Sequence, residues 1–434
     1  MTTSPTNTEL QQQPEQQYSQ PQSQQEQQQE HQHQQSLARF PSHKEPRVWF
    51  LSCGTCPTAR ALVPKLIAHG DKVATGVRGV EIEREDDRAA AYQTFLGELG
   101  EEERTRLKII NMDIRSIGQC QAAISETVEV WGRVDVMLCC TSEAVVGTVE
   151  ELSASTGTLN LVRDQFETNY FGPVNIIKAV LPTFRSKRAG HLLVLTGITG
   201  HIGSPGLGTY CASGWALEGF CDSLAYEIAP FNIKMTILQP SMEVNLLTNK
   251  ITFTPPHPAY SSDTNHAPFV RDILTRTIHR QSFMATQSTP PSAPFSSATS
   301  QEKDKSNAPP KSKSKRRTET PSQSSSSPSS SNLLSSNATE SVSLFPPLPD
   351  SSLIALVAET VHAITAIGGH DNPPTRHIVG HEAVASVKEK LKTVSEELED
   401  FVEVSGAVDI PRGEEVGSGP DNTAESTDSE GEED

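Results

Sequence analysis

Short apolar runs alternate with amphipathic segments through the middle of the chain, a pattern typical of strands separated by helices. Residues 47–51, 72–78, 107–113, 133–138 and 192–195 predict strands. Segments such as Arg60–His69, and the stretch that begins near Tyr210, carry apolar residues at helical spacing. Strands that alternate with helices form parallel sheets with right-handed crossovers. We therefore expect an α/β fold, a Rossmann-like doubly wound parallel sheet.

Three polar stretches interrupt this pattern. Residues 1–44 are rich in Gln, residues 255–348 in Ser, Pro and Thr, and residues 406–434 in acidic side chains. Such segments cannot bury a core and are expected to be disordered. They also explain why apolar residues make up only 35% of the chain. The sequence predicts one domain in two parts, 45–254 and 349–405, interrupted by an insertion at 255–348.

Charge and composition exclude several classes of protein. A net charge of -18 argues against direct nucleic-acid binding, and no apolar run approaches the ~18 residues of a membrane helix. The seven cysteines lack a disulfide-framework spacing, and the N-terminus lacks a signal segment, so a reduced, cytoplasmic protein is expected. The basic run Lys311–Arg317 is either a nuclear-localisation signal or solvated charge.

One stretch carries candidate chemistry. The strand at 192–195 is followed by Gly197–Gly200 and then by the helix that begins near Tyr210. This stretch resembles the active-site segment of the short-chain dehydrogenase/reductase family, which has Tyr-x-x-x-Lys on the helix and a Ser thirteen residues before the Tyr. Here Tyr210 matches the Tyr. The Lys position is Gly214 and the Ser position is Gly197.

The resemblance implies a catalytic role for Tyr210, whose hydroxyl would exchange a proton as hydride moves to or from a nicotinamide. A free Tyr titrates near pH ~10, and a Lys four residues on would lower that pKa. Glycine can replace neither the Lys nor the oxygen-binding Ser. Asn169 falls on the family's fourth catalytic residue, which supports a proton-relay water. A purely structural role at a helix bend is the alternative for Asn169.

The turn after the first strand is the candidate cofactor site, because a strand, turn and helix start form a nucleotide-binding unit. The family pattern there is Thr-Gly-x-x-x-Gly-x-Gly, and its glycines fall on Cys53, Pro57 and Ala59. The residues left to hold NADP or NAD, if either binds, are Ser52, Gly54, Thr55, Thr58 and Ala59, together with Arg78 and Asp113.

In the family, Arg at the position of Arg78 favours the 2′-phosphate of NADP, and Asp at the position of Asp113 contacts the adenine. A surface Arg and a capping Asp are the alternatives. The family also has Asn-Asn-Ala-Gly where this chain has residues 139–142, and none of the four positions matches.

Four cysteines could gather near the altered turn. The first and fourth strands are neighbours in the family's sheet, which would bring Cys139 and Cys140 close to Cys53 and Cys56. A zinc site or a redox disulfide is one interpretation, and small buried residues are the other. The histidines at 201, 362, 370, 377 and 381 show no metal-ligand spacing.

The matched stretches cover roughly 47–254 and 350–405, while the catalytic and glycine-rich positions are altered together. The leading hypothesis is a catalytically impaired relative that acts as a binding or regulatory protein, with a protein partner on its disordered arms. The alternative is an NAD(P)H-dependent oxidoreductase of an apolar ketone or alcohol that uses Tyr210. The resemblance also implies a homodimer through 169–186 and 210–229.

Overall fold

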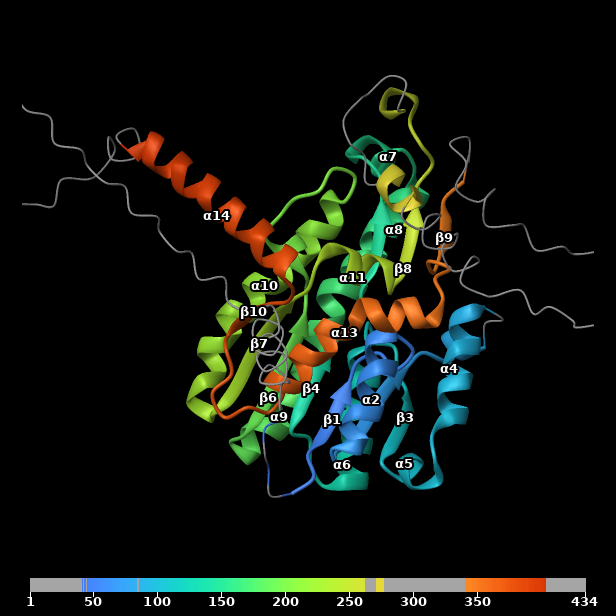
Figure 1. The fold of residues 1–434 in the computed structure, drawn as a ribbon, viewed down its shortest axis with the longest axis vertical. Coiled ribbons are helices and arrows are strands. Elements are labelled where there is room, and N and C mark those ends of the chain that lie inside the picture. The colour runs from blue at the N-terminus through green and yellow to red at the C-terminus, as the bar shows by residue number, and fades with distance from the viewer. Residues whose placement is uncertain are drawn as a thin grey trace, which may run out of the picture. The chain divides into compact units, whose positions relative to one another are not determined.

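The computed structural model describes Pro41, His43 and residues 45–83, 86–261, 271–276 and 340–402. A seven-stranded sheet in the order β10-β7-β6-β4-β1-β2-β3 organises them, and every neighbouring pair in it is parallel. Helices flank this sheet on both sides (Figure 1). The predicted Rossmann-like fold is confirmed. Its strands are β1 Val48–Leu51, β2 Lys72–Val77, β3 Leu107–Asn111, β4 Val136–Cys139, β6 Gly190–Leu195, β7 Ile233–Gln239 and β10 Arg376–Ile378.

The helices follow the strands in the alternating order that the sequence predicts. They are α2 Pro57–Ala68, α3 Gly79–Ile82, α4 Asp87–Glu98, α5 Glu101–Thr105, α6 Ile117–Trp131, α7 Val149–Ser153, α8 Thr156–Phe166, α9 Gly172–Lys187, α10 Gly208–Ile228, α11 Met242–Leu247, α13 Asp350–Ile367 and α14 His381–Asp400. The chain divides into two compact units, one ending at Val387 and the other beginning at Lys388 within α14.

Two apolar layers hold the main sheet. One face packs against α6, α9 and α10, whose buried side chains include Ile124, Ile177 and Leu217. The other face packs against α2 and α13. Among the described helices, α13 alone is apolar and long enough to cross a membrane, but its residues Val357 and Val361 are buried in this core. Burial of that face explains the apolar character of α13.

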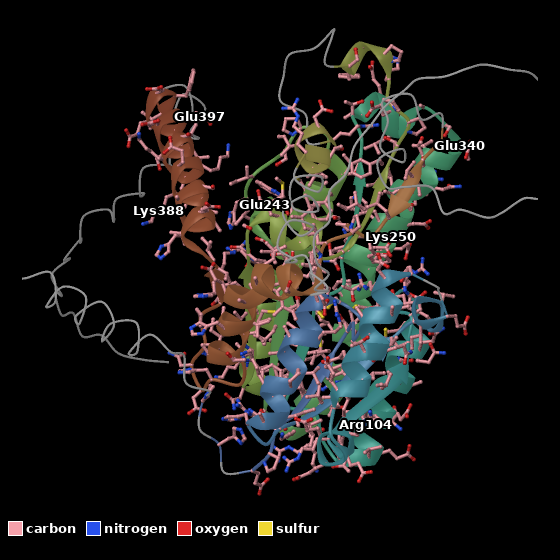
Figure 2. All side chains as sticks on the ribbon, turned by 45° about the vertical axis from the view of Figure 1, so that its right-hand side comes forward. Arg104, Glu243, Lys250, Glu340, Lys388 and Glu397 are labelled. Atoms are coloured by element: carbon pink, nitrogen blue, oxygen red, sulfur yellow. The ribbon has the colours of Figure 1, made fainter. Side chains whose placement is uncertain are left out.

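A second, three-stranded sheet lies beyond the carboxyl end of β4 (Figure 1). It contains β5 Glu143–Val146, β8 Lys250–Phe253 and β9 Val342–Leu344. Lys250, which is labelled in Figure 2, lies 3.4 Å from Glu143 across β8 and β5. Residues 340–348 were predicted to belong to the insertion, yet they form β9 and its exit. The Gln-rich arm up to residue 40, the basic run at 311–317 and the acidic tail lie outside the described residues.

His191 lies at the amino end of β6 and connects three segments that are distant in the sequence. Its Nδ1 accepts the backbone N–H of Gly369 at 3.0 Å, and its Nε2 lies 3.0 Å from Thr236 Oγ1. The Thr236 hydroxyl donates in turn to the carbonyl of Pro374. These partners require a neutral ring with the proton on Nε2. Burial, assisted by the charge of Arg47, lowers the pKa of His191 to about 3.

We therefore expect the free energy of unfolding to fall as the pH drops from about 6.5 towards 3. In that window the unfolded chain binds a proton on residue 191 that the folded chain does not bind. The slope from this one group is about 1.4 kcal/mol per pH unit. Urea unfolding at several pH values should show a shallower acid limb for His191→Gln. An unchanged limb would contradict the buried neutral ring.

Candidate functional site

Tyr210 lies in the first turn of α10 at the carboxyl end of the sheet, where the sequence places it. Its side chain is buried, and its hydroxyl lies 3.2 Å from Ser142 Oγ. Burial raises the pKa of Tyr210 to about 12, although hydrogen bonds from Ser142 and Asn245 oppose the rise. At neutral pH the phenol can therefore donate a proton but cannot serve as a base.

Gly197 occupies the position of the family's Ser and cannot easily accept a side chain. Its φ of 87° and ψ of 165° lie in a region that only glycine adopts readily. A Cβ on Gly197 would also overlap the Nδ2 of Asn245. That amide donates to the carbonyl of Thr196 at 3.0 Å. The backbone and Asn245 together therefore exclude a serine hydroxyl from this position in the present conformation.

Gly214, at the position of the family's Lys, is a different case. It lies inside α10, one turn after Tyr210, with ordinary space around it. A Cβ there would come no closer than 3.8 Å to the nearest atom, the backbone nitrogen of Gly200. Packing around Gly214 therefore does not exclude a Cβ, in contrast to Gly197.

Asn169 lies in a single π-helical turn, Glu167–Phe171, between α8 and α9. Its amide holds the start of β5: Oδ1 accepts the N–H of Glu143 at 2.9 Å, and Nδ2 donates to the carbonyl of Glu143 at 2.8 Å. Single π turns are frequent at functional sites. Here both amide atoms bind the backbone of β5, and Nδ2 also lies 3.4 Å from Ser213 Oγ.

The turn between β1 and α2 is held by its own side chains. Ser52 Oγ accepts the N–H of Cys140 at 2.9 Å, which ties the turn to the end of β4. A Cβ on Gly54 would lie 2.8 Å from Thr75, so the approach of this turn to β2 requires glycine. Thr58 and Ala59 are buried in the first turn of α2.

Arg88, from α4, reaches into this turn. Its Nη2 donates to Thr55 Oγ1 at 3.1 Å and lies 3.5 Å from Cys53 Sγ. Phe345 covers the guanidinium, with its ring centre 4.3 Å from Cζ. The Thr55 hydroxyl donates to Glu81 at 2.7 Å. Arg88 could not be predicted as part of this turn, because Cys53 and Thr55 are remote from it along the chain.

Arg78 and Asp113 also have partners within the chain. Arg78 Nη2 lies 2.7 Å from Glu81 and 3.1 Å from Glu143. Burial opposes the charge of Arg78, but these two carboxylates outweigh it and raise the pKa. Asp113 pairs with Arg115 at 2.6 Å. Burial works against its ionised form, but the hydrogen bonds from Arg115 prevail and lower the pKa of Asp113.

The space left between these groups is small. A cavity of about 20 Å³ remains among Ser52, Cys53, Arg78, Asp113 and their neighbours. Ligand pockets usually measure ~300–1,000 Å³. Several of the residues predicted to bind the cofactor thus lie around one small space, where Thr55, Arg78 and Asp113 are held by other side chains of the chain.

The four cysteines do not form one cluster. Cys140 Sγ lies 3.8 Å from Cys56 Sγ beside Cys53, whereas Cys139 packs against Met137 in the core on the other face of the sheet. A hydrogen bond with Cys140 and burial raise the pKa of Cys56 to about 12. A thiol with such a pKa is a poor nucleophile at neutral pH.

Comparison with known proteins supports the fold and the family. The short chain dehydrogenase family matches residues 60–251. Oxidoreductase BOA17 of Botryotinia fuckeliana (strain B05.10) is 29% identical over 194 residues, 45% of this chain and 65% of that protein. Retinol dehydrogenase 8 of Homo sapiens is 33% identical over 162 residues, 37% of this chain and 49% of that protein. The chain thus spans less than two thirds of the length of either relative.

A solved structure supports the same fold. A short-chain dehydrogenase from Streptomyces avermitilis aligns with a TM-score of 0.53 and 22% sequence identity. The alignment covers 84% of this chain and all of the other. At this identity the likeness concerns the fold alone.

The two catalytic-position glycines should respond in opposite ways to substitution by alanine. Gly197→Ala should lower the free energy of unfolding by about 2 kcal/mol, because alanine is strained at this φ and overlaps Asn245. Gly214→Ala, the matched control, should raise it by about 0.5–1 kcal/mol through higher helix propensity. Urea unfolding of both variants measures the difference. Equal effects would show that Gly197 is not held as described.

Proposed function

Because the chain belongs to the short-chain dehydrogenase/reductase family, we propose that its Rossmann-like domain is a catalytically impaired oxidoreductase that acts as a binding or regulatory protein. The observation that carries this proposal is the cavity of about 20 Å³ at the expected adenosine site. The polar groups that would contact a dinucleotide are paired with other side chains of the chain, Arg78 with Glu81 and Glu143 and Asp113 with Arg115. A dinucleotide would have to break the Arg78–Glu81 and Asp113–Arg115 ion pairs before it could bind.

The catalytic positions support the same proposal. A carbonyl near Tyr210 would meet no serine hydroxyl from position 197, where Asn245 lies instead. Position 214 offers no ammonium group to lower the pKa of Tyr210, which burial raises. Loss of one donor to a developing oxyanion usually costs a factor of ~10²–10³ in rate. Slow turnover is the most that this arrangement supports.

A larger cavity offers a place for the ligand of such a binding protein. It measures about 1010 Å³, lies beside α2 and α4, and has Arg88 in its wall. Its wall includes Phe345 and the prolines that follow β9, together with Arg60 and Lys250. Apolar walls with a few charged groups are typical of ligand pockets. Tyr210 does not line this cavity, so the proposed binding role is separate from the altered catalytic positions.

The second candidate function is the oxidoreductase of an apolar ketone or alcohol, with NADP or NAD as cofactor. The pair of hydroxyls on Tyr210 and Ser142 favours it, because Ser142 could bind a carbonyl oxygen while Tyr210 donates a proton. This candidate requires the Arg78–Glu81 pair and Asn245 to move away and admit the cofactor.

Partners and location remain proposals. A homodimer would use α9 and α10, and the exposure of Trp215 and Tyr226 on α10 supports an interface there. The arms proposed to bind a protein partner lie outside the described residues, as does the basic run at 311–317 proposed as a nuclear signal. The cytoplasmic location rests on composition.

Activity assays on native protein and on Tyr210→Phe distinguish the two functions. We expect no oxidation of NADPH or NADH above background by either protein with a panel of apolar ketones, because the cofactor space is filled. Absorbance of the reduced nicotinamide measures this. Turnover by the native protein that disappears in Tyr210→Phe would instead establish the oxidoreductase. Circular dichroism of both proteins would verify that the variant is folded.

A further inference from the structure

Three side chains of the kinds that bind metal ions meet at the amino ends of β1 and β2. Tyr210 lies at the other end of the strands. His43 precedes β1, His69 follows α2, and Asp71 immediately precedes β2. Their nearest nitrogen and oxygen atoms all lie within 4.8 Å of one another. Within the described part of the chain, no other group of three such residues comes as close. None of the residues predicted to bind a cofactor belongs to this cluster.

Asp71 is the fixed centre of the cluster. Its side chain is fully buried, its Oδ1 accepts the backbone N–H of Arg47 at 2.9 Å, and its Oδ2 accepts the indole N–H of Trp49 at 3.0 Å. Each oxygen of a carboxylate can accept further bonds. Both oxygens also face the histidines: Oδ1 lies 3.1 Å from His43 Nε2, and Oδ2 lies 3.6 Å from His69 Nδ1.

The orientation of His43 makes its Nε2 a lone-pair donor. Its Nδ1 lies against the backbone carbonyl of Glu45, and a carbonyl can only accept, so the Nδ1–H donates there. In the neutral ring, Nε2 then carries a lone pair that faces the Asp71 carboxylate and His69 Nδ1, the latter at 3.1 Å. A proton on His69 Nδ1 could serve only one of these contacts, whereas a cation between the three groups could be bound by all of them. A histidine whose second nitrogen donates to a backbone carbonyl is also the usual arrangement at metal sites.

We propose that His43, His69 and Asp71 bind a divalent transition-metal ion, with Zn²⁺ as the occupant that their chemistry favours. Two imidazoles and one carboxylate are a known zinc ligand set. Ligands held about 2.0–2.1 Å from tetrahedral zinc lie roughly 3.3 Å from one another. The two histidine nitrogens lie 3.1 Å apart, and each lies near a different oxygen of Asp71, His43 Nε2 at 3.1 Å from Oδ1 and His69 Nδ1 at 3.6 Å from Oδ2. These separations are close to that spacing, and small side-chain rotations would bring the three groups onto one ion. A proton on His43 Nε2 can be donated to Asp71 or to His69 but not fully to both, whereas a metal ion can be bound by all three side chains.

The fourth ligand would be water. His43 and His69 are 18% and 24% exposed at their side chains, so the open side of the site faces solvent. The role of the ion is structural, because it lies at the amino ends of the strands, whereas Tyr210 lies at their carboxyl ends. It would fasten the segment before β1 to the α2–β2 turn, where Arg47 also donates to the carbonyl of Gly368 at 2.9 Å.

Calorimetric titration of Zn²⁺ into tag-free, chelator-treated full-length protein tests this inference. We expect one Zn²⁺ per chain, and an affinity at least ~10-fold weaker in His43→Ala and in His69→Ala, since even loss of an outer-shell partner costs that much. His362→Ala, which removes an exposed histidine on α13, is the matched control and should bind like the native protein. Asp71 is left unchanged because it also supports Arg47 and Trp49.

Two further readouts separate this site from the cysteines and from a proton. With Co²⁺ in place of Zn²⁺, the absorption spectrum should lack a sulfur-to-cobalt charge-transfer band. The thermal unfolding midpoint should rise by about 5 °C with Zn²⁺ in the native protein and not in His43→Ala. Absence of zinc binding, binding that survives both histidine substitutions, or a sulfur-to-cobalt band would each overturn the proposal.

Discussion

The ion pairs and hydrogen bonds around the β1–α2 turn hold its side chains in place. Glu81 accepts hydrogen bonds from Thr55 and Arg78, and Arg88 lies against Thr55 from the other side. Burial disfavours the charge on Glu81, but Arg88 and Arg78 outweigh this and lower its pKa. Partly buried, mutually hydrogen-bonded charges are costly to separate, because each would be left unpaired. This network stabilises the turn, and in the function proposed above it is what stands in the way of a pyrophosphate and adenosine.

Most of the fold could be predicted from the sequence, because the strands are short apolar runs and their order follows the alternation with helices. The turn and the helix start at Tyr210 were also predictable, since strand, turn and helix are contiguous in the chain. The strand at 342–344 could not be predicted from the sequence. It lies in a polar stretch, and its pairing with β8 depends on a partner about ninety residues earlier. Local pattern carries no information about such a pairing.

The contents of the candidate site were less predictable. The motif positions of Gly197 and Gly214 were visible, but the amide of Asn245 in the space beside Gly197 is a tertiary contact. The separation of Cys139 from Cys140 could have been anticipated, because neighbouring strand residues point to opposite faces. The cluster of His43 with Asp71 gave no sequence signal, since it joins the end of a Gln-rich stretch to a turn after α2.

Titration of the native protein with NADPH and NADH tests most directly whether the chain's own side chains fill the cofactor site. Calorimetry and nicotinamide fluorescence should detect no saturable binding up to millimolar concentration, which corresponds to a binding free energy weaker than about -4 kcal/mol. Micromolar binding of either dinucleotide would contradict the proposal that the cofactor site is filled. It would mean that the Arg78–Glu81 pair opens at little cost and that the cofactor site is retained.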